Sequence, residues 1–300
     1  MSTINDPILN IVTKISSTLS IVGSLFLVYR FIKSNSQYQT NLSNRIILYM
    51  SVLDIVGSIN FFIGEFAFKS AVGCMIQGIF VEMAVSGPLW NMVFCLNVLL
   101  RVVFNMHREN ANKLECIYHI ICWGIPIIGN VLGVLSDSYV VVGAWCWYGA
   151  EYVGLRFGTF YAWVFFSVVF NIFVSLVVMW FIKSTTGKFT KNKNLLRSGK
   201  RQLLYVVAFL ISFGPSSITR IVQLVTGKQV YVLTVMQATT LPLQGFLNCL
   251  VYLVLKQVKL REIRDSFLPL TRSQSTSENW RFQSVEYSIS SSSSDVSDEV

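Results

Sequence analysis

The stretch from Cys74 to Asn105, CMIQGIFVEMAVSGPLWNMVFCLNVLLRVVFN, decides the fold. The 27 residues of Cys74–Leu100 contain one charged side chain, Glu82. A helix needs about 20 apolar residues to cross a bilayer, so this stretch predicts a long, tilted transmembrane helix. A cysteine begins it, and the basic residues Arg101 and Arg108 follow it. The predicted span therefore has a direction as well as a length.

The composition of the whole chain agrees with a membrane protein. Of its 300 residues 53% are hydrophobic and 13% are charged, and the mean hydropathy is +0.56, which does not fit an ordinary globular chain. The net charge of +9 lies in short basic blocks between apolar runs, so we expect no nucleic-acid partner. Six cysteines show no paired spacing and no cluster with histidine, so we expect neither a metal nor another cofactor.

Seven apolar windows follow one another along the chain and predict an all-α membrane protein with a seven-transmembrane helix bundle. The first window is the weakest, because Lys14 and several Ser and Thr dilute it. The start of the chain lacks the features of a cleaved secretory signal, so we expect this span to remain. The windows are Ile11–Tyr29, Ile46–Phe68, Cys74–Leu100, Ile117–Leu135, Phe157–Ile182, Leu203–Val225 and Val230–Leu255.

Lysine and arginine residues predict the orientation. One side of the membrane receives 17 of them, in the segments Arg30–Arg45, Arg101–Lys113, Lys183–Arg201 and Lys256–Arg264, and the other side receives 5. Since basic loops face the cytoplasm, we expect the N-terminus outside and the C-terminus inside.

This topology divides the chain into four parts. Residues 1–10 form a short extracellular N-terminus, and residues 11–255 form the bundle. Residues 256–269 mix apolar and basic side chains, which predicts a short amphipathic helix on the anionic inner leaflet. Residues 270–300 are Ser-rich and acidic, so we expect a disordered cytoplasmic tail.

Two cysteines lie on the predicted outer side. Cys74 opens the third span and Cys146 lies in an outer loop, so both meet an oxidising compartment and we expect a disulfide between them. The chain-entropy model gives such a bridge about 4 kcal/mol of stabilisation. The alternative is two free thiols. The other four cysteines lie within or at the ends of spans, where a small apolar side chain explains them.

Three of the charged side chains inside the predicted spans, where a charge is costly, are candidates for a function. Glu82 should face the bundle interior, either as a ligand contact or in a structural hydrogen bond. Asp54 lies deeper, and we favour a buried polar network for it over contact with a ligand. Arg220, on the outer half of the sixth span, can clamp an anionic ligand or extend its charge to the lipid headgroups.

The last two spans contain prolines. Pro215 and Pro242 each remove a backbone donor, which predicts kinks, although such kinks are common in membrane helices. Asn248 and Tyr252 are one helical turn apart on one face, where they can exchange hydrogen-bond partners.

Two cytoplasmic segments have both an ordinary and a functional interpretation. Lys183–Arg201 contains seven basic and no acidic residues, which topology alone explains, while a docking surface for a cytoplasmic protein is the functional alternative. The serines of the tail either keep it soluble or form a phosphorylation cluster, and acidic residues after them favour a kinase. These serines are Ser290, Ser291, Ser292, Ser293 and Ser294.

Four strings between about Ile46 and Phe267 resemble one receptor family. They are Cys74-Met-Ile-Gln-Gly78, Trp145-Cys146-Trp147, Ile218-Thr219-Arg220-Ile221 and Gln244-Gly245-Phe246-Leu247-Asn248 before Tyr252. The sequence thereby resembles the cyclic-AMP-receptor-like family of G-protein-coupled receptors, best known from slime moulds. It departs from the rhodopsin-like class, since Leu100-Arg101-Val102 replaces Asp-Arg-Tyr and Cys249 follows Asn248 in place of proline.

The resemblance implies a multi-pass receptor of the plasma membrane that couples to a heterotrimeric G protein, with cyclic AMP or another small anion as a possible ligand. The hypothesis needs two helix packings that differ in affinity for that ligand. A receptor kinase and an arrestin-like protein at the tail, and membrane lipid, are further expected partners. The hypothesis places Glu82, Arg220, Trp145 and Trp147 at the ligand, and Arg101, Pro215, Asn248 and Tyr252 in activation.

Three other classes of protein fit less well. A retinal protein needs a lysine in its last span, and Val230–Leu255 contains none. A multi-pass transporter or channel for a small solute is the main alternative, but it should show repeated halves or a track of ionisable groups. An enzyme is not expected, because no nucleophile or acid-base cluster can be assembled.

Overall fold

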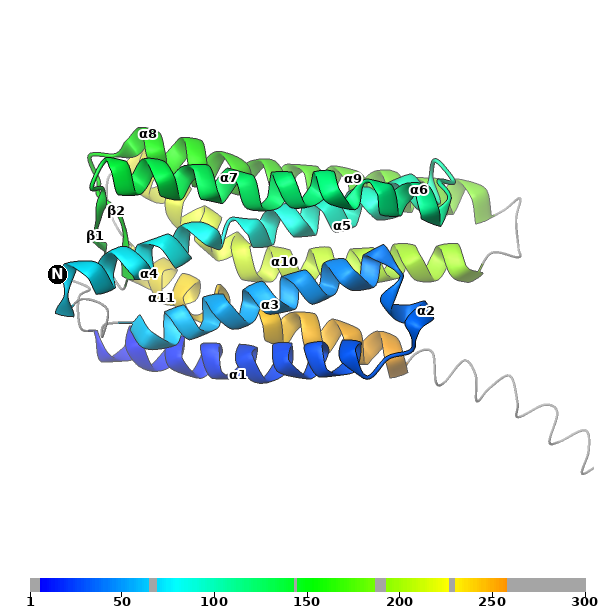
Figure 1. Cartoon of the computed structure of the whole chain (residues 1–300), viewed down its shortest axis with the longest axis horizontal. Coiled ribbons are helices and arrows are strands. Elements are labelled where there is room, and N and C mark those ends of the chain that lie inside the picture. The colour runs from blue at the N-terminus through cyan, green and yellow to red at the C-terminus, as the bar shows by residue number, and fades with distance from the viewer. Residues whose placement is uncertain (1–5, 65–68, 143–144, 187–192, 227–229, 258–300) are drawn as a thin grey trace, which may run out of the picture. The chain divides into compact units, whose positions relative to one another are not determined.

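The computed structural model describes residues 6–64, 69–142, 145–186, 193–226 and 230–257. It divides into two compact units, residues 1–251 and residues 252–300, and the second is described only at 252–257. The first unit is a helical bundle with one two-stranded hairpin (Figure 1). Its elements are α1 (Pro7–Ile32), α2 (Ser36–Gln39), α3 (Leu42–Ile63), α4 (Ala71–Met83), α5 (Ser86–Val102), α6 (Arg108–Lys113), α7 (Glu115–Leu135), β1 (Tyr139–Val142), β2 (Trp145–Tyr148), α8 (Val153–Leu155), the π-helix η2 (Arg156–Tyr161), α9 (Ala162–Thr186), α10 (Lys193–Thr226) and α11 (Tyr231–Thr240).

The helices are consistent with the seven predicted spans. Within the described residues, six runs are long and apolar enough to cross a membrane, and a bent pair of helices makes a seventh when it is counted as one span. That pair is α11 and a helix from Gln244 to Gln257, at 53° to each other. The break between them falls at Pro242, where the sequence predicts a kink. The six runs are Pro7–Ile32, Leu42–Ile63, Ala71–Val102, Glu109–Leu135, Val153–Ser184 and Gly199–Gln223.

Local signals fix several helix ends. The Asp6 side chain accepts a hydrogen bond from the backbone N–H of Ile8, and Pro7 occupies the first turn of α1, where its missing donor costs nothing. The Asn41 side chain caps α3, because its Oδ1 accepts a hydrogen bond from the backbone N–H of Ser43 at 3.2 Å. At its other end α3 stops at Gly64, whose φ of +49° favours glycine. The helix of the second span therefore begins four residues before the predicted Ile46, and residues 65–68 of the predicted window lie outside the described residues.

The third span is not the unbroken helix that its composition predicts. It consists of α4 and α5, separated by a turn at Ala84 and Val85 (Figure 1). Pro88 explains the break, because it has no N–H to donate to the carbonyl of Ala84, and that carbonyl accepts instead from the N–H of Gly87 at 3.1 Å. The expectation of one continuous helix is wrong at this point. The two halves still form one candidate span, Ala71–Val102.

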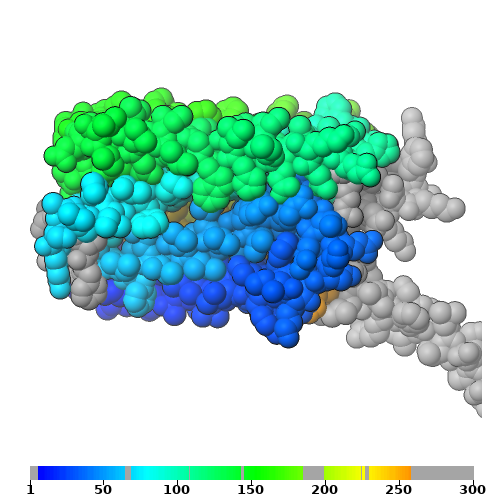
Figure 2. All heavy atoms as spheres, in the orientation of Figure 1, coloured from blue at the N-terminus to red at the C-terminus, as the bar shows by residue number. Residues whose placement is uncertain are grey.

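The surface of α1 has the polarity of a helix in lipid. Its buried face carries small polar residues, and Ser17, Ser20 and Ser24 are 0% exposed. Its exposed face carries large apolar residues, among them Ile11 at 58% and Val22 at 63%. Small residues allow close helix packing where lipid surrounds the bundle, and apolar side chains outside are then the stable arrangement. The face formed by α1, α3, α4 and α7 is shown in Figure 2.

The first unit has two different ends. At one end lie the β1–β2 hairpin, α8 and the beginning of α1, and we call this the hairpin end (Figure 1). At the other end lie the short helices α2 and α6, and we call this the opposite end.

Candidate functional site

A disulfide fastens the hairpin to the third span. Cys74 of α4 and Cys146 of β2 are bonded, with their Cα atoms 5.2 Å apart, which confirms the predicted pair. The segment predicted as an outer loop is an antiparallel hairpin in which Val141 faces Cys146 and Tyr139 faces Tyr148. The disulfide therefore places β2, with its two tryptophans, against the bundle.

Gln77 reinforces this junction with both ends of its side-chain amide. Its Oε1 accepts a hydrogen bond from the backbone N–H of Cys146 at 2.8 Å, and its Nε2 donates to the carbonyl of Gly64 at 3.0 Å. One buried side chain thus joins the end of α3, α4 and the hairpin. The sequence alone does not reveal this role of Gln77, although its position one helical turn after Cys74 is a usable signal.

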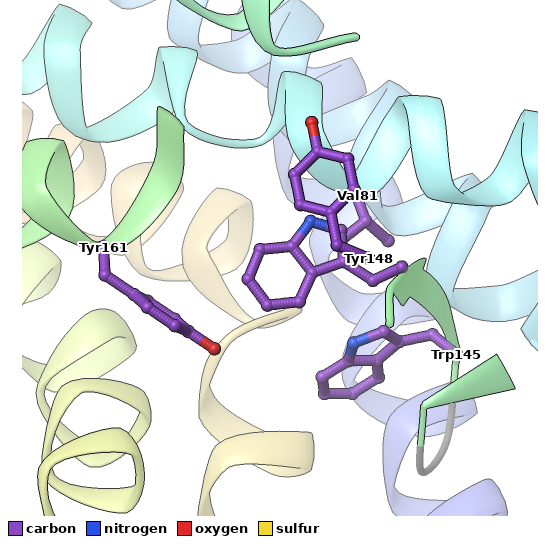
Figure 3. Close-up of a cluster of buried hydrophobic side chains, with 5 residues drawn as sticks. Val81, Trp145, Tyr148 and Tyr161 are labelled. Carbon is purple, nitrogen blue, oxygen red and sulfur yellow. The ribbon is translucent and has the colours of Figure 1, made fainter. Parts of the chain in front are cut away.

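An aromatic cluster fills the space under the hairpin (Figure 3). Trp147 stacks with Tyr148 at 5.4 Å between ring centroids and meets Tyr161 of η2 edge to face, also at 5.4 Å. Trp145 meets Phe61 of α3 edge to face at 5.7 Å. All four residues of β2 are buried, so this strand belongs to the core of the hairpin end.

A narrow pocket opens beside this cluster. It contains about 410 Å³ of space free of protein atoms, its open mouth included. Its walls come from α3, α4, β2, η2, α10 and α11, so most of the bundle contributes to it. The lining residues are Phe61, Val81, Ala84, Trp145, Trp147, Phe160, Tyr161, Phe213, Ser216, Arg220, Gln237 and Leu241.

Glu82 lies directly behind the pocket wall. It is 0% exposed, and its Oε2 accepts a hydrogen bond from Trp147 Nε1 at 3.1 Å. A Cβ at Gly129 of α7 would stand 2.6 Å from Glu82 Oε1, so the missing side chain at Gly129 makes room for the carboxyl group. The structure thus shows the structural hydrogen bond, one of the two roles that the sequence left open for Glu82.

The guanidinium groups of two arginines lie over aromatic rings of this cluster. Arg220 of α10 lines the pocket, with its guanidinium carbon 5.8 Å from the Tyr161 ring centroid, and donates to Gln223 at 2.8 Å. Arg156 of η2 lies 5.4 Å from the Trp147 ring and donates through Nε to the carbonyl of Tyr148 at 3.0 Å. Within the described ranges neither guanidinium has a carboxylate within ion-pair distance. The two guanidinium groups therefore place positive charge at and beside the pocket.

The tyrosines of the hairpin stay neutral. Burial raises the pKa of Tyr139 to about 12 and raises the pKa of Tyr148 further. Both phenols act as donors, Tyr139 to Asn130 Oδ1 at 2.7 Å and Tyr148 to the carbonyl of Gly129 at 2.8 Å. These hydrogen bonds hold the hairpin on α7.

Asp54 and Asn248 meet in the middle of the bundle. Asn248 Nδ2 donates to Asp54 Oδ2 at 2.9 Å. Nearby, the backbone N–H of Gly245 donates to Ser20 Oγ at 3.1 Å, and Gly245 has no space for a side chain because Ser20 and Ser24 contact it. This arrangement agrees with the polar network that we favoured for Asp54.

A polar network that the sequence analysis did not find lies at the opposite end. Arg45 of α3 makes a bidentate ion pair with Glu115 of α7, with N–O distances of 2.8 and 2.6 Å. Tyr49 donates to the same carboxylate at 2.8 Å. Arg45 and Glu115 are 70 positions apart, so sequence spacing gave no signal for the pair.

The first turn of α3 also connects to α5 and α10. Arg201 of α10 donates to Asn44 Oδ1 at 2.9 Å, and its guanidinium lies 5.8 Å from the Phe94 ring. Arg101 of α5 donates to Asn41 Oδ1 at 3.4 Å, and Asn97 donates to Ser43 at 2.8 Å. Three helices are therefore joined at this end by hydrogen bonds between side chains.

The structure brings together some predicted site residues and not others. Trp145, Trp147 and Arg220 line one pocket and Glu82 lies behind it, while Arg101 lies near the opposite end. α10 runs through Pro215 as one helix, so a kink there stays a prediction. Tyr252 belongs to the second unit, and Ser290–Ser294 lie outside the described residues. A search of the described residues finds no group of metal-binding side chains.

Comparisons with known proteins agree with this architecture. A family model described as slime mold cyclic AMP receptor matches residues 2–270. Cyclic AMP receptor-like protein A of Dictyostelium discoideum is 28% identical over 239 residues, which cover 79% of this chain and 62% of the relative. Cyclic AMP receptor 1 of the same organism is 25% identical over 135 residues, 44% of this chain and 34% of that protein.

A plant protein matches over a greater length. G-protein coupled receptor 1 of Arabidopsis thaliana is 24% identical over 271 residues, 85% of this chain and 81% of that protein. In contrast, this chain spans less than two thirds of the two Dictyostelium relatives.

Proposed function

The chain belongs to the slime mold cyclic AMP receptor family, and on that premise we propose that it is a plasma-membrane receptor that binds a small anion at the hairpin end and activates a heterotrimeric G protein. The family is a receptor family and not an enzyme family. The anion pocket, the orientation and the coupling are parts of the proposal.

Arg220 is the observation that carries the ligand proposal. Its guanidinium lines the aromatic pocket and is held by Gln223, a neutral partner, so its charge is available to an anion. Arg156 adds a second positive charge next to Trp147. Trp145 and Trp147 line the pocket, where parts of their aromatic rings can contact a planar ligand. Because one relative is named cyclic AMP receptor 1 and another cyclic AMP receptor-like protein A, a cyclic nucleotide is the first ligand to test.

Two observations support the proposed orientation. The disulfide at the hairpin end is stable in an oxidising compartment, which favours placing that end outside the cell. The basic segments then face the cytoplasm, as the positive-inside rule requires. We propose residues 1–10 as the outer N-terminus, 11–255 as the bundle, 256–269 as an amphipathic helix on the inner leaflet and 270–300 as a cytoplasmic tail.

Activation is proposed to change the packing at the opposite end. A ligand that prefers one of two packings shifts the population toward it. Arg101, Pro215, Asn248 and Tyr252 are proposed to respond, and Ser290–Ser294 to receive phosphate from a receptor kinase and to recruit an arrestin-like protein. The transporter alternative has no specific support, since Asp54 and Glu82 each accept a hydrogen bond from a different residue of the bundle.

The experiment that tests this function measures G-protein dissociation in cells that carry the receptor. Cells are exposed to cyclic AMP, cyclic GMP and other small anions, and Arg220→Ala is compared with Gln223→Ala. We expect an anionic agonist to lose at least tenfold in potency with Arg220→Ala, while Gln223→Ala keeps the charge and most of the potency. Equal potency for Arg220→Ala and the parent would reject the pocket assignment. Solute flux in reconstituted vesicles, without nucleotide exchange, would favour a transporter.

A further inference from the structure

A second cavity lies between α3 and α4, on the outer surface of the bundle. It contains about 710 Å³ of space free of protein atoms, its open side included. Its rim is apolar and exposed, as Ile59 at 46% and Ile76 at 47% show. Its floor contains two buried amides, Asn60 at 7% exposed and Gln77 at 2%. We call this cavity the α3–α4 groove. Both helices lie on the face shown in Figure 2.

The position of the groove decides which kind of molecule fills it. Both of its helices belong to candidate membrane spans, and the rim side chains point away from the bundle interior. The surrounding medium at these positions is lipid and not water. From Val56 to Ile63 the groove extends about 10 Å along α3, at 1.5 Å per residue, and it ends near the hairpin end. Its occupant is therefore a lipid of the leaflet at that end.

The floor requires a hydrogen-bond donor from that lipid. Asn60 Nδ2 donates to the carbonyl of Gln77 at 3.4 Å, but Asn60 Oδ1 accepts no hydrogen bond from any described residue. Both polar atoms of Gln77 are already used, by Cys146 and Gly64. A polar atom left without a partner at a lipid-facing site is costly, so an occupant that donates to Asn60 Oδ1 is favoured.

The lack of charged side chains in the lining of the groove limits which lipids can bind there. Within the described residues the lining of the groove contains no Asp, Glu, Lys or Arg, so it offers no partner to a phosphate or an ammonium group. An acyl chain can fill the apolar rim but has no donor for Asn60. A sterol has both features, since it is a rigid apolar body with one uncharged hydroxyl group.

We propose that the α3–α4 groove binds a sterol, with its hydroxyl donating to Asn60 Oδ1 and its rings against Ile59, Ile76 and Phe80. The groove is also connected to the β1–β2 hairpin through hydrogen bonds. Asn60 contacts the backbone carbonyl of Gln77, and the Gln77 side chain holds Cys146 of the disulfide. A bound sterol therefore stabilises the junction of α3, α4 and the hairpin.

Photolabelling of the purified full-length receptor in lipid nanodiscs tests the proposal. The probe is a sterol with a photoreactive diazirine on its ring system, and labelled peptides are located by mass spectrometry. We expect saturable labelling of α3 and α4 that unlabelled cholesterol or ergosterol displaces and excess phosphatidylcholine does not. A sterol whose hydroxyl has the opposite configuration should compete about fivefold more weakly, the effect of one lost hydrogen bond.

Two variants that fill the groove from different helices make the test specific. Ile59→Trp and Ile76→Trp both alter exposed side chains, and each should reduce labelling at least tenfold while the melting temperature without sterol stays that of the parent. Ile128→Trp is the matched control, because Ile128 is 61% exposed on α7 and distant in sequence from the groove. It should leave labelling unchanged. Asn60→Leu should weaken binding about fivefold.

Several results overturn the proposal. Labelling that is spread over all helices, or that both groove-filling variants leave intact, shows that the groove is not a sterol site. Competition by phosphatidylcholine as strong as that by the sterols shows that an acyl chain occupies it. A sterol-dependent rise in melting temperature that survives Ile59→Trp and Ile76→Trp assigns the stabilisation to another surface.

Discussion

Trp147 Nε1 donates a hydrogen bond to Glu82 Oε2 at 3.1 Å, in a place where both side chains are buried. The other carboxyl oxygen, Glu82 Oε1, has no hydrogen-bond partner in the described part of the chain. Trp147 lines the aromatic pocket and Glu82 does not, so this contact couples the pocket wall to α4. We propose that Glu82 positions Trp147 through this hydrogen bond.

Substitutions at Glu82 test that role. Glu82→Gln keeps an oxygen that accepts from Trp147, so we expect an agonist response close to that of the parent. Glu82→Leu leaves the Trp147 N–H buried without an acceptor, which should cost about 1–3 kcal/mol and lower the melting temperature in detergent. In a Trp147→Phe background the same change should cost less, because the donor is already gone. An equal cost in both backgrounds would show that the two residues act independently.

Loss of the Cys74–Cys146 disulfide should destabilise the hairpin end. The bridge joins residues 72 positions apart, for which the chain-entropy model gives about 4 kcal/mol. We expect Cys146→Ser to lower the melting temperature and to reduce surface expression. Cys116→Ser is the control, since Cys116 is an exposed free cysteine, and it should behave as the parent does. If Cys146→Ser and Cys116→Ser melt alike, the disulfide does not stabilise the fold.

The sequence predicts the number of spans and the disulfide for clear physical reasons. Seven apolar windows have the length that a bilayer requires, and the structure has helices consistent with each. Cys74 and Cys146 are recognisable because the topology places both on one side. The break in the third span was missed, although Pro88 was visible, because its apolar composition continues without change through Ala84 and Val85.

Contacts between segments that are far apart in the chain could not be predicted from the sequence. Nothing in the spacing of Arg45 and Glu115 indicates that they pair, since the pairing depends on how α3 and α7 pack. Arg156 begins the π-helix Arg156–Tyr161 and lies against the Trp147 ring, and no local signal in the sequence separates this π-helix from an ordinary helix start. The sequence thus names several pocket residues, while the partners of Glu82 and Arg220 emerge only from the packing.

The contact between Asp54 and Asn248 predicts a strong effect of one substitution. Asn248→Leu removes the described donor to Asp54 and leaves a carboxyl group in the bundle without it, which should lower stability by about 1–3 kcal/mol. Combining it with Asp54→Leu should recover part of the loss, because two apolar groups replace the polar pair. Thermal unfolding of the four proteins measures this coupling. Strictly additive losses would contradict a direct role for the contact.

The hydrogen bond between Arg201 and Asn44 predicts constitutive activity when it is removed. It joins α10 to the first turn of α3 at the opposite end, where the proposed receptor presents its surface to the G protein. If this bond favours the packing described here, Arg201→Ala shifts the population toward the other packing. A lost hydrogen bond of about 1 kcal/mol changes the equilibrium about fivefold, so basal G-protein dissociation should rise by up to that factor.

Two further variants make the Arg201 test specific. Asn44→Ala removes the other partner and should raise basal signalling as Arg201→Ala does, while the double variant should add little, since both changes break the same bond. Lys200→Ala serves as the control, because it removes a positive charge from the neighbouring, exposed position of α10. An equal rise with Lys200→Ala would mean that the charge of the basic segment, and not the bond to Asn44, sets the basal level. Basal signalling that stays at the parent level in both Arg201→Ala and Asn44→Ala would show that this bond does not hold the packing.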